Sequence, residues 1–405
     1  MAHLLITLIL LAPPFLSGPK VAARLKPDSR SRTWVRGAPL PEVDTPASFL
    51  ALSFMESSLF PSSSGKPLTK ERAQRKLPQE LSWLKGMKYP DIPVTFDPHT
   101  IKYLKWFRFN RTGRNVIRDW IEKSGKYRKM VISTLKRHHL PTALMYIALI
   151  ESGYVKTTRS WAGALGLWQF MPSGTKVYGL AKSYWIDQRI DPELSTEAAM
   201  LYFADLHYRF KNWALAMGAY NCGYGRMLQS MRRYSTNDYF KLSSYENALP
   251  RETRLYVPKM QAVAIADINR KLFKIDSLKM APPYSFEVIH LPGGVSLATL
   301  AHITGISFAT LWDLNREYIR KRLPPGKGRW PVRLPPGTLA RAKNRIAKQT
   351  PGWFKHSVYE VQLGDTLPSI ARMFGTTTMK LRQLNSINTT TQISLGLLLV
   401  VPTRK

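Results

Sequence analysis

The stretch that decides the fold reads PTALMYIALIESGY and covers residues 141–154. Pro141 suits the first position of a helix, because its ring presets the backbone and its missing N–H is not needed there. The residues after it are apolar on nearly every side, which is typical of a buried helix. Glu151 lies near the C-terminal end of this run. We therefore expect its carboxyl group to be paired, protonated or at the wall of a cavity.

An apolar setting changes the chemistry of Glu151. Burial disfavours the charged form of a carboxyl group, so the pKa of Glu151 should rise. The negative end of the helix dipole also favours the protonated acid. A carboxylic acid that keeps its proton near neutral pH can donate it to a glycosidic oxygen. The plain alternative is a buried glutamate that is paired with a cation and serves only the fold.

The residues around Glu151 predict a mainly helical domain. A glycine-containing loop (Gly163, Gly166) and the run GLWQFMP at 166–172 follow. Further helices are expected to begin near Asp191, where Ser195 or Thr196 supplies the cap, and over residues 213–220 and 256–268. Asp187 and Asp191 are expected to stabilise turns and a helix N-terminus. No alternation typical of strands occurs between residues 100 and 275.

The C-terminal part contains an internal repeat with an offset of 70 residues. Strand-like runs precede and follow each copy, at 286–289 and 332–335, and at 359–362 and 398–402. This pattern predicts two βααβ units, the first with an insertion near residues 316–330. The matching pairs are Leu297 and Leu367, Leu300 and Ile370, Ala301 and Ala371, Gly305 and Gly375, Leu311 and Leu381, Leu314 and Leu384, and Asn315 and Asn385.

The N-terminal segment and the net charge of the chain indicate where the protein acts and what it binds. Residues 1–23 resemble a secretory signal, with a short apolar run and small residues near its end, and an uncleaved anchor is the alternative. Residues 24–95 are rich in proline, serine and basic residues, and are expected to be an irregular leader or linker. The formal net charge of +34 indicates a polyanionic polymer or an anionic surface as the working environment. No zinc-finger spacing or RNP-like run supports a specific nucleic-acid role.

Neither a metal nor a cofactor is expected from the sequence. No metal-ligand spacing and no phosphate-binding glycine loop are present. The one cysteine, Cys222, is expected to be an inert packed thiol, since no histidine within its motif is placed to activate it.

Four motifs resemble a known family. These are Glu151-Ser152, GLWQFMP at 166–172, AYNCG at 219–223 and ETRLYV at 252–257. Their order and spacing are similar to those of the family 1 lytic transglycosylases of bacterial cell walls, whose catalytic domain has a goose-type lysozyme-like fold. The C-terminal units resemble LysM modules, and YEVQLGDTL at 359–367 is a good match. The whole layout is similar to the membrane-bound lytic transglycosylase D group.

The resemblance implies a domain organisation. It implies a mainly α catalytic domain over 96–275 and two small α+β LysM-like modules. The first module, over 284–340, lacks the Gly-Asp-Thr element, and the second covers 357–403. No cysteine follows the apolar N-terminal run, which departs from lipid-anchored members.

The resemblance also implies an activity, with Glu151 as its catalytic residue. Glu151 acts as acid and then as base in cleaving the bond between N-acetylmuramic acid and N-acetylglucosamine, leaving a 1,6-anhydro end. Two alternatives stay open: a hydrolytic muramidase, which needs a second carboxylate, and a non-catalytic wall-binding protein. The residues implied to bind substrate or line its groove are Ser152, Ser160, Gln169, Phe170, Met171, Tyr220, Asn221, Glu252 and Tyr256.

Some of these residues also have structural interpretations. Phe170 is favoured as a core residue, Ser160 also reads as an ordinary loop serine, and the Tyr220-Asn221 pair also suits a helix cap. The implied partners are glycan strands of peptidoglycan that contain N-acetylglucosamine. The implied location is the periplasm or cell envelope of a bacterium, with peripheral association with the envelope.

Overall fold

The computed structural model describes residues 77–326, 328–348, 356–388 and 393–402. The expected signal segment 1–23 and most of the expected leader 24–95 lie outside the described residues. All described residues belong to one compact unit within residues 40–405. Within the described ranges, no helix is long and apolar enough to cross a membrane.

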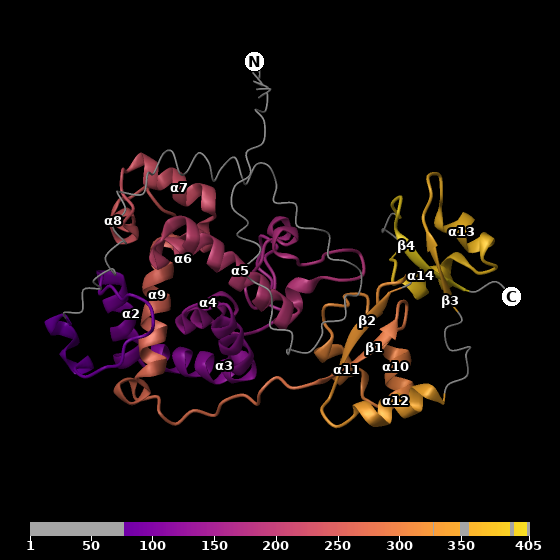
Figure 1. The fold of residues 1–405 in the computed structure, drawn as a ribbon, viewed down its shortest axis with the longest axis horizontal. Coiled ribbons are helices and arrows are strands. Elements are labelled where there is room, and N and C mark those ends of the chain that lie inside the picture. The colour runs from indigo at the N-terminus through magenta and orange to yellow at the C-terminus, as the bar shows by residue number, and fades with distance from the viewer. Residues whose placement is uncertain (1–76, 327, 349–355, 389–392, 403–405) are drawn as a thin grey trace, which may run out of the picture. The chain divides into compact units, whose positions relative to one another are not determined.

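Residues 77–275 form a helical region (Figure 1), which the sequence predicted from residue 96 onward. Only isolated bridges, such as Arg159 with Leu165, interrupt its helices and loops. The α-helices are α2 (Pro98–Phe109), α3 (Arg111–Arg137), α4 (Met145–Ser152), α5 (Pro192–Phe210), α6 (Trp213–Cys222), α7 (Tyr224–Arg233), α8 (Tyr239–Ser244) and α9 (Arg251–Ile268). Short 3-10 turns are η2 (Gln79–Leu84), η3 (Thr142–Leu144), η4 (Pro172–Gly174), η5 (Lys176–Tyr178), η6 (Gln188–Ile190) and η7 (Arg270–Phe273).

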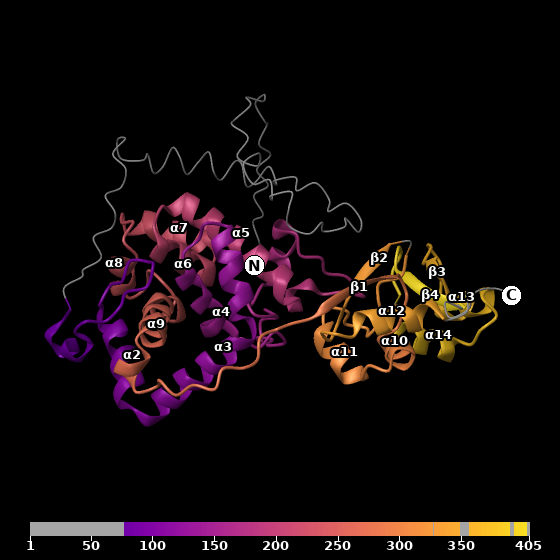
Figure 2. The same cartoon turned by 60° about the horizontal axis from the view of Figure 1, so that its bottom comes forward.

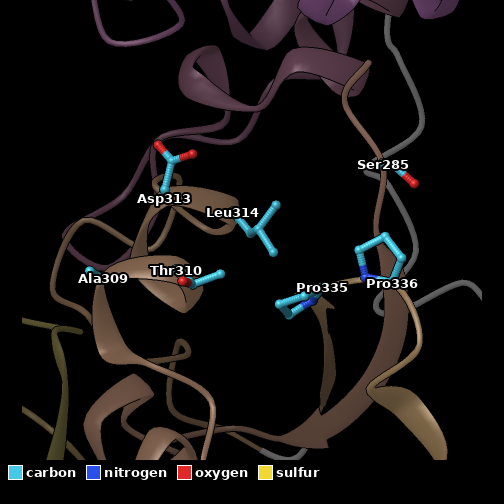
Figure 3. Close-up of a pocket in the computed structure, with 7 residues that line it drawn as sticks. All are labelled: Ser285, Ala309, Thr310, Asp313, Leu314, Pro335 and Pro336. Atoms are coloured by element: carbon cyan, nitrogen blue, oxygen red, sulfur yellow. The ribbon is translucent and has the colours of Figure 1, made fainter. Parts of the chain in front are cut away.

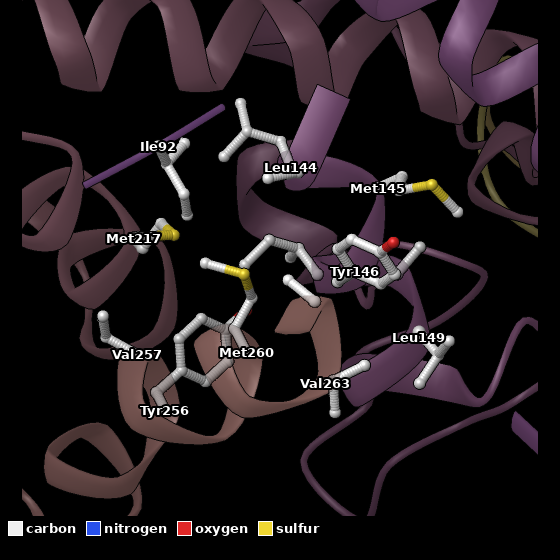
Figure 4. Close-up of a cluster of buried hydrophobic side chains, with 14 of the residues drawn as sticks. Ile92, Leu144, Met145, Tyr146, Leu149, Met217, Tyr256, Val257, Met260 and Val263 are labelled. Carbon is white, nitrogen blue, oxygen red and sulfur yellow. The ribbon is translucent and has the colours of Figure 1, made fainter. Parts of the chain in front are cut away.

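Helix α9 lies at the centre of this region. It packs against α2, α3, α4 and α6, and most of its side chains are buried. The turned view in Figure 2 shows α9 among these helices. Figure 4 shows Tyr256, Met260 and Val263 of α9 close to side chains of η3 and α4. The helix with Glu151 is therefore held against the middle of the core.

The start of α5 differs in detail from the sequence prediction. Asp191 is the N-cap, and its side chain accepts hydrogen bonds from the amides at the second and third helical positions. Ser195 and Thr196 lie inside the helix and donate to the carbonyls of Asp191 and Pro192. The prediction that Ser195 or Thr196 caps the helix was wrong, because Pro192 fits the first turn and moves the start upstream. The role expected for Asp191 is confirmed.

The end of the expected leader is part of the core. Leu81 and Leu84 on η2 are fully buried, as is Val94 nearby. Asn269 fixes this segment by accepting from the amide of Lys88 (2.7 Å) and donating to its carbonyl (2.9 Å). Residues 77–95 therefore pack on the helical region and do not form the irregular leader that the sequence predicted. Their few apolar residues are separated by prolines and charges, which hid the pattern in the sequence.

The two C-terminal βααβ units are present as expected. In the first, β1 (Glu287–Pro292) pairs antiparallel with β2 (Arg329–Leu334), with Glu287 opposite Leu334. In the second, β3 (His356–Glu360) pairs antiparallel with β4 (Leu398–Pro402). The helices are α10 (Leu297–Thr304) and α11 (Phe308–Leu314) in the first unit, and α13 (Leu367–Met373) and α14 (Thr378–Asn385) in the second. A further helix, α12 (Leu339–Ala347), packs on α10 and β1.

One asparagine holds each unit together at equivalent places. Asn315 donates to the carbonyl of Arg333 (2.8 Å) and accepts from its amide (2.8 Å). Asn385 makes the same pair of bonds with Val400, at 2.8 and 2.7 Å. Both asparagines are fully buried. These paired bonds replace a strand neighbour, and they explain why both copies of the repeat have asparagine here.

Candidate active site

Glu151 occupies the last turn of α4. The residues before it, 145–149, are all buried, and Gly153 ends the helix in a left-handed conformation (φ 59°). Glycine adopts this backbone region without the steric cost that other residues meet. The helix thus ends one residue after Glu151, whose side chain is partly exposed at the edge of the core.

The surroundings of Glu151 raise its pKa to about 7, and burial is the main cause. Glu252 acts in the same direction through its negative charge. The hydroxyl of Tyr256 opposes the rise by donating a 2.6 Å hydrogen bond to Oε1, and the charge of Lys259 also opposes it. A large share of the Glu151 side chains therefore keeps the proton at neutral pH, as the sequence led us to expect.

Two tyrosines, the buried Tyr256 and the half-buried Tyr220, form the wall beside Glu151. Tyr256 reaches it from α9, and Tyr220 donates to the carbonyl of Trp168 (2.7 Å) from α6. The Tyr220 ring stacks on Phe203, with 4.4 Å between the ring centroids. Burial raises the pKa of both tyrosines well above the usual value, so both hydroxyls stay protonated as hydrogen-bond donors.

The glycine-containing loop is fastened to the end of α4. Ser152 donates from its hydroxyl to the carbonyl of Leu167 (2.9 Å). Gln169 has a positive φ of 48°, a conformation that is costly for a residue with a side chain. The nitrogen of its side-chain amide donates to the carbonyls of Thr158 and Gly166, both at 2.9 Å. The Gln169 side chain therefore braces the loop.

A set of hydrogen-bonded polar side chains also links α6 to α9. Thr253 donates to the amide oxygen of Asn221 (2.7 Å), and the Asn221 nitrogen donates to Glu252 (3.4 Å). Glu252 is exposed, and it is close enough to Glu151 to raise the pKa of that carboxyl group. The structure thus brings Glu252 and Asn221 together with the Glu151–Tyr256 pair.

Three of the residues that the sequence implied to bind substrate remain to be placed, and their contacts differ from one another. Phe170 is buried and packs edge-on against Tyr220, which agrees with the core interpretation. Ser160 accepts a hydrogen bond from the amide of Ala164 (3.0 Å) and closes a turn. Met171 is 44% exposed. No hydrogen bond among the described residues joins Ser160 or Met171 to Glu151, so their place in a substrate groove stays a prediction.

Sequence reasoning missed one conspicuous side chain. Trp161 follows Ser160 in the loop and is completely exposed. A tryptophan in that position buries none of its large apolar surface, and such a ring is suited to stacking on a ligand. The signal was available in the sequence, because Trp161 stands between two small residues in a loop rather than at helical spacing.

Comparison with known families identifies the domains. Residues 130–243 match the family described as "Transglycosylase SLT domain". This region is an SLT domain. Residues 285–350 match the family described as "Lytic transglycosylase MltD, LysM-like domain", and residues 359–402 match "LysM domain". The expected order of one transglycosylase domain and two LysM-type units is confirmed.

Two curated proteins are similar to parts of this chain. The chain is 29% identical over 294 residues to "Membrane-bound lytic murein transglycosylase D" of Escherichia coli strain K12, covering 68% of this chain and 63% of the relative. It therefore spans less than two thirds of the length of that relative. It is also 35% identical over 106 residues to a "Putative tributyltin chloride resistance protein" of Alteromonas sp. strain M-1, covering 26% of this chain and 51% of that protein.

Two solved structures match part of the chain. One is an inactive mutant of the lytic transglycosylase Slt from Pseudomonas aeruginosa, at 26% identity over 38% of this chain and 25% of that one, with a TM-score of 0.31. The other is the 70 kDa soluble lytic transglycosylase SLT70 from Escherichia coli, at 20% identity over 41% and 27%, also with a TM-score of 0.31.

The described residues contain other reactive groups and hollows away from Glu151. No group of three or more His, Cys, Asp or Glu side chains there is arranged to hold a metal ion. Burial raises the pKa of Cys222 to about 11, so its thiol stays protonated. A pocket of about 450 Å³ in the first LysM-type unit lies between α11 residues, such as Thr310 and Leu314, and the prolines after β2 (Figure 3).

Proposed function

We propose that the protein is a peptidoglycan lytic transglycosylase with Glu151 as its catalytic residue. One observation carries this proposal: burial holds the pKa of Glu151 near 7 while Tyr256 orients one carboxylate oxygen. An acid with that pKa can give up a proton and take one back near neutral pH. The SLT domain and the relative named as a murein transglycosylase support the same conclusion.

The reaction needs only one carboxyl group. Glu151 donates its proton to the glycosidic oxygen as the bond from C1 of N-acetylmuramic acid breaks, and N-acetylglucosamine leaves as an alcohol. The resulting carboxylate then takes the proton from the C6 hydroxyl of the muramoyl sugar. The C6 oxygen closes onto C1, forms the 1,6-anhydro ring and restores the protonated Glu151. No water is consumed, in contrast to glycosidases that use a second carboxylate.

The surrounding side chains hold the sugar and the carboxyl group. Tyr256 fixes the Glu151 carboxylate, Ser152 and Gln169 brace the loop, and Asn221 places Glu252 at the edge of the site. Trp161 offers a face on which a sugar ring can stack. The groove residues that complete the site are Ser160, Met171 and Tyr220, with Phe170 packed behind Tyr220.

The working partner is the glycan of the cell wall. The LysM-type units bind strands that contain N-acetylglucosamine, and residues 96–275 act as the catalytic unit. The net charge of +34 favours a polyanionic wall or membrane surface. The protein acts in the periplasm or envelope of a bacterium, to which the N-terminal signal directs it.

Mass spectrometry of the soluble products from purified peptidoglycan tests this proposal, with Glu151→Gln as the matched variant. We expect products with 1,6-anhydro ends, one water lighter than hydrolytic products, and none from the variant. Hydrated reducing ends would identify a muramidase and direct attention to Glu252. Retained wall binding without products would identify a non-catalytic binding protein.

A further inference from the structure

A short segment of the SLT domain, residues 182–193, contacts both LysM-type units, and we call it the docking segment. It begins with a tight turn, in which the amide of Ser183 donates to the carbonyl of Ile186 (2.8 Å). The Ser183 hydroxyl oxygen accepts from the amides of Trp185 (3.2 Å) and Ile186 (3.3 Å). The turn is therefore held by hydrogen bonds within the segment itself.

The first LysM-type unit incorporates part of this segment into its core. Ile186 is 4% exposed and clusters with the buried side chains of that unit, including Leu291 and Leu297. The amide of Asp187 donates to the carbonyl of Glu317 (2.8 Å). A side chain of the SLT domain thus completes the hydrophobic core of another domain, which a freely tethered module does not require.

A buried ion cluster fastens the same unit to the start of α5. Arg333 on β2 bonds to Asp191 (2.5 Å) and Glu193 (3.1 Å) of the docking segment, and to Glu317 of its own unit (2.7 Å). Arg333, Asp191 and Glu317 are all less than 10% exposed. Removing one partner of such a cluster leaves buried charge without compensation, which strongly destabilises the contact.

The second LysM-type unit contacts the two aromatic residues of the turn. The hydroxyl of Tyr184 donates to the carbonyl of Asn385 (3.0 Å), and the indole of Trp185 donates to the carbonyl of Leu398 (3.0 Å). Arg320 of the first unit donates to the carbonyl of Tyr184 (3.2 Å), and its guanidinium lies 4.0 Å from the Tyr184 ring centroid. Both units therefore meet at Tyr184.

The docking segment also holds the loop of the candidate active site. Arg189 is 1% exposed, and its guanidinium donates to the carbonyls of Gly163 (2.8 Å) and Phe170 (3.0 Å). Asp187 holds the other side of that guanidinium with two hydrogen bonds, at 2.9 and 2.7 Å. The backbone of Arg189 is so close to Gly166 that a Cβ there would lie 1.9 Å from the Arg189 carbonyl oxygen.

A second contact joins the first unit to the chain just after Glu151. Lys156 is 5% exposed and donates to the backbone carbonyl of Asp313 on α11. Burial lowers the pKa of Lys156 to about 8. The first unit thus contacts the chain on both sides of the loop at 163–170, through Lys156 before the loop and Asp191 after it.

We propose that the docking segment seats both LysM-type units on the SLT domain and couples them to the loop at 163–170, so that Arg333 and Trp185 are positioning residues for the reaction. This inference rests on the proposed function only for its kinetic consequence. Glycan held by the units reaches Glu151 at a fixed distance, and the units support the loop even when they hold no glycan. A tethered module has neither property.

Hydrogen exchange of the full chain tests the coupling without any assay of activity. Arg333→Met breaks the ion cluster, and Arg333→Lys keeps the positive charge. Trp185→Phe removes a single donor and covers the case in which Arg333→Met fails to fold. Arg341→Met, an exposed arginine on α12, is the matched control. We expect amides at 156–170 to exchange at least about tenfold faster in Arg333→Met and measurably faster in Trp185→Phe. We expect Arg333→Lys to be intermediate and the control to be unchanged.

Kinetics on two substrates separate positioning from tethering. On soluble glycan fragments too short to reach a LysM-type unit, we expect Arg333→Met to lower kcat by about tenfold or more, because small misplacements of catalytic groups are costly. Unchanged exchange at 156–170, with unchanged kcat on short fragments and weaker binding to insoluble wall, would overturn the proposal. If the wild-type chain cleaves no glycan, the proposed function fails, and hydrogen exchange alone decides the coupling.

Discussion

Replacing Glu151 with glutamine should stabilise the protein, and only at higher pH. Burial raises the pKa of Glu151 from 4.5 in the unfolded chain to about 7 in the folded one. Between these values the unfolded chain gives up a proton that the folded chain keeps, so stability falls as the pH rises from about 4.5 to 7. Glutamine carries no ionisable proton and accepts the same hydrogen bond from Tyr256, so the variant escapes this loss.

The size of the effect follows from the shift. A difference of 2.5 pKa units corresponds to about 3.4 kcal/mol at 1.36 kcal/mol per unit. Glu151 is partly exposed, and solvent reduces this figure, so we expect Glu151→Gln to be about 2–3 kcal/mol more stable than wild type at pH 8. At pH 4 both forms are neutral at this position, and the difference should vanish.

Urea unfolding at pH 4, 6 and 8 measures this difference directly, with the slopes of the two proteins compared at each pH. Glu252→Gln is the matched control, because it makes the same chemical change at an exposed carboxylate. Equal stability of wild type and Glu151→Gln at pH 8, or a gain of the same size at pH 4, would refute the reasoning. Equal stability at pH 8 would mean that Glu151 is solvated or paired in the folded chain, and an equal gain at pH 4 would mean that ionisation of Glu151 does not cause the difference.

Three further changes probe the site and the repeat. Tyr256→Phe removes the hydrogen bond that lowers the pKa of Glu151, so the alkaline limb of the pH–activity profile should move to higher pH; an unmoved limb would contradict this. Trp161→Ala should raise KM for glycan with little change in kcat, as steady-state kinetics would reveal. Asn385→Ala leaves the buried amide of Val400 without a partner, and should cost the second LysM-type unit about 1–3 kcal/mol in thermal or urea unfolding.

Features that depend on residues close together in the sequence could mostly be predicted. The apolar run at 141–154 predicted both the buried helix and the raised pKa of Glu151, because apolar neighbours favour burial and burial is the main cause of the raised pKa. The 70-residue repeat predicted the two βααβ units, since hydrophobic spacing reports each small core. The motifs that resemble the lytic transglycosylases predicted which regions would surround the carboxyl group.

Contacts over long sequence separations could not be predicted in this way. Tyr256 reaches Glu151 across 105 residues, and no local pattern gives the direction of its hydroxyl. The cap of α5 was misplaced because Asp191 and Ser195 are both good capping residues, and the packing of Pro192 decides between them. Arg333 looked like one more basic residue in a chain with a net charge of +34, and only the folded structure shows that it is buried.

The ion cluster at Arg333 has a consequence for synthesis. Asp191 precedes its partner Arg333 by 142 residues, so a chain made from the N-terminus exposes the acidic half of the cluster first. At typical rates of chain growth the wait lasts roughly 10 s. During that time Ile186 and Trp185 also lack the domains that cover them. The region around residues 185–191 therefore lacks these contacts on a nascent chain until the C-terminal units have been made.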